Sequence, residues 1–319
     1  MKRPIVRLSS LQLTNIKNVK NGTIYMPNTV NKILSADKAE ILGIYGQNGS
    51  GKTAIVDALY FLQKVMVGAD LDQSLEDYMT IDSDAAEIFA DFNIFMDGIV
   101  FEIGYTLSLR REEKEIVINR ETLRAAKNEN GIRTNKTTFM DYQRNQMDAI
   151  FKPQKRLDEI LEANKEIKTD LIVARKMAEK SNCSYIFGES SREIFCREYK
   201  NGFQQFSVII SSLFEFALKD LFVIRNTHSG VISANFVLPM AFRIENDNIG
   251  AKGDFAVPLT EPILVDEERK NLLETIVEQI NIVLYTIIPG LQVTIKNYGK
   301  QSLDNGEEGW KLELMSKRE

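Results

Sequence analysis

The strongest constraint on the fold is a glycine-rich stretch that fits the phosphate-loop pattern G-x-x-x-x-G-K-[ST] at every fixed position. Glycines without a Cβ let backbone N–H groups approach phosphate oxygens, and a helix that starts there points its unpaired N–H groups at the anion. The lysine can reach the β- and γ-phosphates, and the threonine hydroxyl is a hard oxygen ligand suited to Mg²⁺. The residues are Gly46, Gln47, Asn48, Gly49, Ser50, Gly51, Lys52 and Thr53.

The sequence on either side of this loop has the order that the motif requires. Ile41-Leu42-Gly43-Ile44-Tyr45 is a short apolar run typical of a buried strand. After the loop, apolar residues from Ala54 to Leu62 recur at helical spacing, and Gly68 is suited to end the helix at about residue 66. Strand, loop and helix together favour a true phosphate loop over a chance glycine-rich turn.

Alternating apolar residues predict antiparallel strands before and after the loop. Residues 5–26 read as two strands with a turn at Asn21-Gly22. Residues 87–109 read as a hairpin that turns at Asp97-Gly98 and has one wholly apolar face, which indicates a half-buried antiparallel sheet. Residues 116–118 add a third strand to this meander.

Helical spacing dominates the middle of the chain. Residues 124–200 change character, and from Asp141 to Lys180 the chain is rich in Lys, Glu, Gln and Leu. Apolar residues at helical spacing predict a small helical insertion here, since the sustained heptads of a coiled coil are absent. Residues 203–222 predict one strongly amphipathic helix. Alternation returns at residues 291–295 and 310–314, which predicts two further strands.

The segment around the loop resembles the N-terminal part of the ABC-type ATPases of the SMC, RecF and OLD group, which includes prokaryotic AAA family ATPases of defence and DNA repair. In that group an Asn-Phe-Lys or Asn-Phe-Arg corner joins two strands ahead of a loop reading Gly-x-Asn-Gly-Ser-Gly-Lys-Thr. Here the corner reads Asn15-Ile16-Lys17-Asn18, and Asn48 stands inside the loop. The resemblance implies that Lys17 lies near the nucleotide, and a solvated turn lysine is the alternative interpretation.

The same resemblance implies an α/β fold with an ABC-type P-loop core, an antiparallel β-subdomain and a helical insertion. Residues 1–125 would form the N-terminal ATPase lobe, residues 126–200 the helical insertion, and residues 201–319 a return to the ATPase core. The family's Gln-loop has no clear counterpart, and no Ser-Gly-Gly-like signature segment occurs. We therefore expect the core to be incomplete at the C-terminus.

One stretch is a candidate for the acidic strand, in which an Asp holds Mg²⁺ through water and a Glu polarises the attacking water. Its acids are Asp266 and Glu267, the candidate catalytic residues. The apolar run before them is only three residues long, begins after Pro262, and continues directly into a helical pattern. Acids in the first turn of a helix complement its dipole, so we favour a helix start here over a catalytic strand.

Composition excludes several other classes of protein. One histidine and two cysteines among 319 residues leave no multi-histidine or zinc-finger site. The net charge of −5 argues against a polybasic nucleic-acid binder, and the basic residues between 110 and 136 favour a charge-rich solvated surface over a DNA-contacting face. No apolar stretch approaches the roughly 20 residues of a membrane span, so we expect a cytoplasmic protein without a membrane partner.

Two functions are consistent with these features. The first is an ATPase that binds ATP and Mg²⁺ and hydrolyses ATP once a second protomer or a C-terminal half supplies the signature motif. ATP-driven homodimerisation would then control DNA binding or an effector protein, in anti-phage defence or DNA repair. The second is a nucleotide-binding regulatory or scaffold module that does not hydrolyse ATP. A small-molecule kinase fits less well, because such enzymes have no β-hairpin ahead of the loop.

Overall fold

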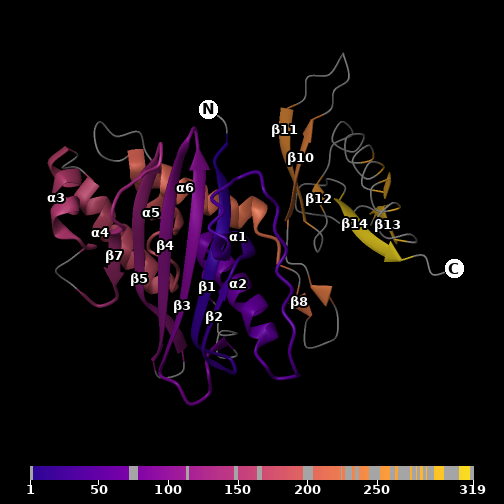
Figure 1. The fold of residues 1–319 in the computed structure, drawn as a ribbon, viewed down its shortest axis with the longest axis horizontal. Helices are drawn as coiled ribbons and strands as arrows, with labels where there is room; N and C mark the ends of the chain where they lie inside the picture. Colours follow the sequence, from indigo (N-terminus) through magenta and orange to yellow (C-terminus); the bar gives the residue numbers. More distant parts are fainter. Residues whose placement is uncertain are drawn as a thin grey trace. The chain divides into compact units, whose positions relative to one another are not determined.

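A computed structural model of the chain forms two compact units, Met1–Leu221 and Phe222–Glu319 (Figure 1). In the first unit the structure describes residues 3–71, 78–112, 115–146, 150–163, 167–196 and 204–221. In the second it describes residues 222–223, 225–226, 232–233, 237–243, 252–258, 263–264, 291–297 and 309–316, with Glu274, Glu278, Asn281, Ile282 and Tyr285.

The first unit is built on a seven-stranded antiparallel sheet (Figure 1). Its order is β2-β1-β3-β4-β5-β6, and β7 also pairs with β5. The helix that follows the phosphate loop, α2 (Lys52–Met66), separates β1 from β3 in the sequence, although these two strands are neighbours in the sheet. The strands are β1 (Ile5–Ile16), β2 (Val19–Tyr25), β3 (Ala85–Met96), β4 (Ile99–Glu112), β5 (Glu115–Glu129), β6 (Ile132–Arg133) and β7 (Thr137–Gln143).

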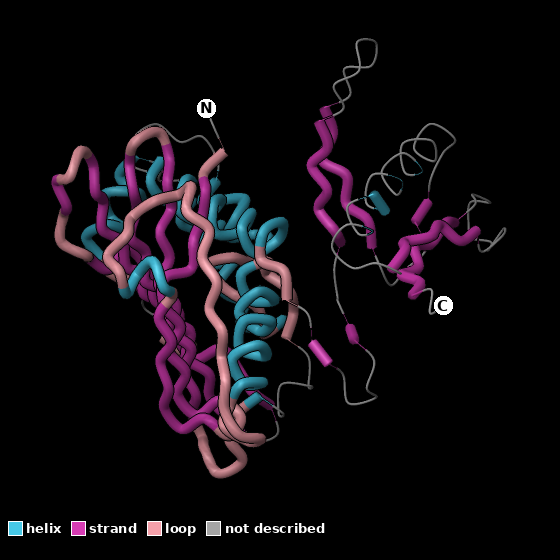
Figure 2. The backbone as a smooth tube through the Cα atoms, turned by 45° about the vertical axis from the view of Figure 1, so that its right-hand side comes forward, coloured by secondary structure: helices cyan, strands magenta, loops and turns pink. Residues whose placement is uncertain are grey.

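One face of this sheet is apolar, and the longer helices lie along one side of the sheet (Figure 2). The predicted apolar face of β4 is confirmed, since every second residue from Phe101 to Leu109 is buried. Phe92 of β3 packs edge-on against Phe216, and Phe139 of β7 packs against Phe206. The remaining helices are α1 (Pro27–Val30), α3 (Gln154–Ala163), α4 (Ile167–Ser181), α5 (Glu189–Cys196), α6 (Gln204–Glu215) and the π-helix η2 (Phe216–Asp220).

A buried carboxyl group ties the segment after α4 to the sheet. Glu121 of β5 has no exposed surface and accepts hydrogen bonds from Tyr105 Oη (2.6 Å), Ser184 Oγ (2.6 Å) and the Tyr185 N–H (2.7 Å). Burial raises the pKa of Glu121, and these hydrogen bonds partly offset the effect. Burial also raises the pKa of Tyr105 well above its usual value. The network fixes the chain between α4 and α5 on the apolar face.

Two sequence predictions about elements in this unit were wrong. The turn between the first two strands falls at Lys17–Asn18, whereas Asn21 and Gly22 lie inside β2. Strand β5 runs on to Glu129, and β6 and β7 follow inside the expected helical insertion at residues 126–200, so helix begins only at Gln154. The ends of α2 and the Asp97-Gly98 turn agree with the prediction.

The second unit contains small antiparallel pairings. Strand β13 pairs with β14, as the alternation at residues 291–295 and 310–314 predicted, and β14 also pairs with β12. The strands are β8 (Arg225–Asn226), β9 (Ile232–Ser233), β10 (Val237–Arg243), β11 (Lys252–Pro258), β12 (Ile263–Leu264), β13 (Leu291–Asn297) and β14 (Gly309–Ser316). No helix in the described part of the chain is long and apolar enough to cross a membrane.

Candidate nucleotide site

The predicted phosphate loop forms a tight turn at the N-terminus of α2. Gly49 and Gly51 both have left-handed backbones, with φ of 82° and 90°, a conformation that glycine adopts without steric cost. Gly51 is the N-cap of α2, and the Ser50 N–H donates to the Gln47 carbonyl at 3.2 Å. Residues 46–50 are exposed, as is Thr53, so the backbone of the loop is accessible from solvent.

Lys52 is folded over the loop. Its ammonium donates to the carbonyl oxygens of Gly46 and Gln47, both at 2.6 Å, and lies 3.4 Å from Ser50 Oγ. A Cβ on Gly46 would lie 2.6 Å from Ser50 Oγ, so a larger residue at this position would require the Ser50 side chain to move. The loop therefore curves around the Lys52 ammonium, a cation that can bind a phosphate oxygen. The donors of this loop and the Thr53 hydroxyl are chemically suited to a nucleotide with Mg²⁺.

The β1–β2 corner, at Asn15 to Asn18, packs directly against this loop. The Asn18 side-chain amide donates to the Gly49 carbonyl. The corner is itself held by the segment that precedes β3: the Thr80 N–H donates to the Asn15 carbonyl at 3.0 Å. The structure thus brings the two segments that carry the family resemblance into one site.

Lys17 lies beside the loop and points at α2. Its ammonium forms an ion pair with the Asp57 carboxylate and lies 5.7 Å from the centre of the Tyr78 ring. Asp57 is one helical turn after Thr53 and only 7% of its side chain is exposed. The sequence reasoning missed both Asp57 and Asn18. The signal for Asp57 was available, since it is the one charged residue in the apolar stretch from Ala54 to Leu62.

The predicted buried strand ahead of the loop is not observed. Residues 41–47 have no regular secondary structure, and Ile41 and Tyr45 are 92% and 93% exposed. A buried parallel strand needs neighbours on both edges, and none of the described strands pairs with this segment. The apolar residues of this segment are suited to burial, but a buried strand also needs neighbouring strands to pair with.

The candidate catalytic residues Asp266 and Glu267 lie outside the described residues. Strand β12 covers Ile263 and Leu264 and ends two residues before Asp266. Within the described part of the chain, no group of three or more His, Cys, Asp or Glu side chains is arranged to hold a metal ion. Thr53 thus stays the one predicted Mg²⁺ ligand that the structure places, at the start of α2.

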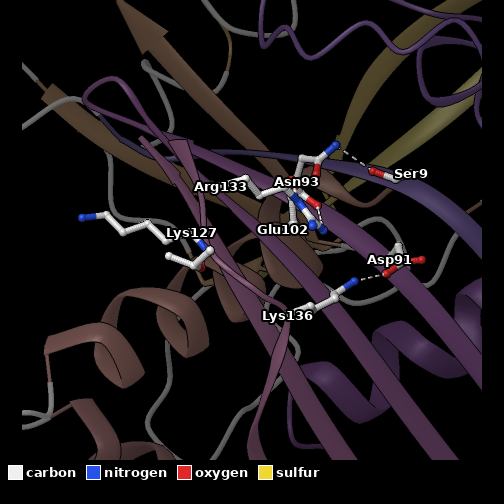
Figure 3. A network of polar contacts seen from close by, with 8 residues as sticks. Ser9, Asp91, Asn93, Glu102, Lys127, Arg133 and Lys136 are labelled. Atoms are coloured by element: carbon white, nitrogen blue, oxygen red, sulfur yellow. Dashed lines mark hydrogen bonds and ion pairs between the residues drawn. The ribbon is translucent and has the colours of Figure 1, made fainter. Parts of the chain in front are cut away.

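Most of the described basic residues between 110 and 136 form ion pairs, and Figure 3 shows the pairs of Arg133 and Lys136. Arg133 forms a bidentate pair with Glu102, with both N–O distances at 2.7 Å. Lys136 pairs with Asp91 at 2.6 Å. Further pairs join Arg120 to Asp141, Arg110 to Glu112 and Lys127 to Glu129. This pairing favours the charge-balanced solvated surface over a DNA-contacting face.

The segment that carries the loop is similar to a known protein family. Residues 41–167 match the family model described as "AAA domain, putative AbiEii toxin, Type IV TA system". The chain also matches the structure of the recombination mediator protein RecF-ATP in the RecFOR pathway, with 12% sequence identity and a TM-score of 0.30. That match covers 94% of this chain and 63% of the RecF chain, so this chain spans about 63% of its length. No curated protein matches the chain.

The first unit is mixed α/β, and the residues that fit the phosphate-loop pattern lie directly at the start of α2. The family match includes the loop and the meander, and it shows a similarity of residues 41–167 to that AAA domain.

Proposed function

We propose that this chain binds ATP with Mg²⁺ through residues 46–53. The observation that carries the proposal is the turn formed by Gly49 and Gly51 around the Lys52 ammonium. A bound triphosphate replaces the Gly46 and Gln47 carbonyls as the partners of Lys52, and the α2 N-terminus faces its oxygens. Thr53 provides the Mg²⁺ ligand, and Lys17 adds a second cation beside the loop.

The test is the affinity for a fluorescent ATP analogue with Mg²⁺. Lys52→Ala removes the cation and should abolish binding, and Lys168→Ala, an exposed lysine of α4 away from the loop, is the matched control. The control should bind like the wild-type chain. Equal affinity of Lys52→Ala and the wild type would contradict the proposal.

Hydrolysis is proposed to require residues beyond the loop, supplied by a second protomer or a C-terminal half with a signature segment. Ile41 and Tyr45 support this, because their exposed apolar surface is suited to strands of a completed core. A homodimer that forms with ATP is the expected assembly. Light scattering with and without a non-hydrolysable ATP analogue and Mg²⁺ tests it, and an unchanged mass would argue against ATP-driven dimerisation.

The alternative is a nucleotide-binding regulatory or scaffold module that does not hydrolyse ATP. Phosphate release from the isolated chain separates the two, since appreciable turnover contradicts the non-hydrolysing module. Turnover would also make Asp266 and Glu267 the residues to test, by a double substitution with Ala. Control of DNA or an effector protein, in anti-phage defence or DNA repair, is the biological role we propose. The matched family model is described as that of a putative AbiEii toxin in a type IV toxin–antitoxin system.

A further inference from the structure

Asp57 connects the phosphate-loop helix with the β1–β2 corner. It lies on α2 four residues after Thr53, a displacement of about 6 Å along the helix axis, and its carboxylate pairs with Lys17. We propose that Asp57 is a positioning residue, which holds the Lys17 ammonium beside the loop with its other N–H donors directed at the phosphates. This inference rests on the proposed function and names the residue that makes Lys17 effective there.

The backbone of Lys17 is already fixed on both sides. Its φ of 51° is left-handed, its N–H donates to the Tyr78 carbonyl at 2.8 Å, and its own carbonyl accepts from Thr80 Oγ1 at 2.7 Å. The freedom that remains belongs to the long side chain, which has many rotamers in solution. Asp57 restricts that freedom, and a ligand group ordered in advance binds more tightly because less entropy is lost on binding.

Lys17 can keep this pair when a nucleotide binds. An ammonium has three N–H donors, so a bond to Asp57 leaves others for phosphate oxygens. Removing the partner of a buried ion is much more costly than separating a surface pair, and the Asp57 side chain is 7% exposed while that of Lys17 is 29% exposed. Lys17 is therefore buried on its Asp57 side and open towards solvent.

The proposal predicts that Asp57 affects nucleotide affinity only through Lys17. The experiment is a double-mutant cycle in the full chain, with Lys17→Met, Asp57→Asn and both together, read as affinity for the fluorescent ATP analogue with Mg²⁺. Each single variant should bind about tenfold more weakly, and the double variant should bind like Lys17→Met alone. Asp57→Glu keeps the charge and should recover part of the affinity that Asp57→Asn loses.

Independent losses, with the double variant about a hundredfold weaker than wild type, would overturn the proposal, and so would tighter binding by Asp57→Asn. If Lys17→Met does not fold, because it leaves the buried Asp57 carboxylate without its cation, Asp57→Asn and the double variant still give the decisive comparison, since neither buries that charge. Unequal affinities of those two overturn the inference. Failure of the wild-type chain to bind overturns the proposed function and this inference together, whereas wild-type binding with an additive cycle overturns this inference alone.

Discussion

Val19 of the β1–β2 hairpin lies directly against the backbone of Gly51 in the phosphate loop. An ideal Cβ on Gly51 would lie 2.5 Å from Val19 Cγ2, closer than side-chain carbons approach. Gly51 also has the left-handed φ of 90° and caps α2. The shape of the loop therefore depends on the hairpin as well as on its own glycines.

This relationship predicts unequal effects of two otherwise similar substitutions. Gly49→Ala introduces only backbone strain, because nothing lies within 4 Å of the position that its Cβ would occupy. Left-handed strain of this kind costs about 1–3 kcal/mol. Gly51→Ala adds the clash with Val19, so it should weaken affinity for the ATP analogue by at least a further factor of about ten, equivalent to about 1.4 kcal/mol.

The steric cause can be checked with a compensating change. Val19→Ala removes the methyl group that Gly51→Ala would meet, so the double variant should bind more tightly than Gly51→Ala alone. Val19→Ala by itself should bind nearly as well as the wild type. If Gly49→Ala and Gly51→Ala lose affinity equally, strain alone explains both and the hairpin contact has no part in it.

The far half of α2 is fixed to the π-helix η2 by one side chain. The Gln63 Nε2 donates to the Ala217 carbonyl at 2.8 Å and to the Leu221 carbonyl at 2.7 Å. Gln63→Leu keeps the apolar packing and removes both bonds, and we expect it to lower the free energy of unfolding by about 1–3 kcal/mol. Urea denaturation of the full chain, followed by far-UV circular dichroism, measures this.

Gln63→Glu is the matched comparison, because it keeps the shape and replaces a donor by an acceptor that faces two carbonyl oxygens. It should be less stable than Gln63→Leu at neutral pH. The order wild type, Gln63→Leu, Gln63→Glu follows from the donor role of Nε2. A Gln63→Leu chain as stable as the wild type would show that the contact contributes nothing net.

Features that depend on neighbours in sequence were predictable. Helix α2 ends where Gly68 allows a left-handed backbone, and the β3–β4 hairpin turns at Asp97-Gly98, which both have positive φ. Lys52 and Thr53 were placed because the loop pattern fixes their order relative to a helix start. In each case the conformation that the residue prefers locally is the one that it adopts in the structure.

Features that depend on distant contacts were not predictable. Asn21-Gly22 has the stronger turn preference, yet the turn forms at Lys17–Asn18, where Tyr78 and Thr80 bind the backbone. The apolar run at residues 41–45 indicated burial but could not identify a covering strand. The Lys17–Asp57 pair joins residues forty positions apart, which no local pattern encodes.

Glu121 predicts a pH dependence of stability. Its pKa is raised in the folded chain above the ordinary value of 4.5, chiefly by burial. Below pH 4.5 the carboxyl is protonated in both the folded and the unfolded chain. As the pH rises further, the unfolded chain releases this proton while the folded chain retains it, so the free energy of unfolding falls until the pH passes the folded pKa.

Glu121→Gln removes the titrating group and isolates this contribution. Urea denaturation of both chains from pH 4.5 upward measures this contribution. As the pH rises, the free energy of unfolding of the wild type should fall relative to that of Glu121→Gln. The absolute stability of the variant is not the readout, because its amide places an N–H donor near the Tyr185 N–H. Parallel pH profiles for the two chains would contradict the raised pKa.

The ion pairs on the polar face of the sheet should contribute little to the stability of the fold. Arg133 is 49% exposed and Glu102 24% exposed, so Glu102→Gln should change the free energy of unfolding by less than about 1 kcal/mol. The same pairing predicts that Arg120, Arg133 and Lys136 do not serve as phosphate contacts, because each already has a carboxylate partner. Replacing these three cations by Gln should leave the salt dependence of any binding to duplex DNA unchanged. Loss of three phosphate contacts would instead reduce the slope of log K against log salt by about 2.7, and that result would reassign this surface to nucleic acid.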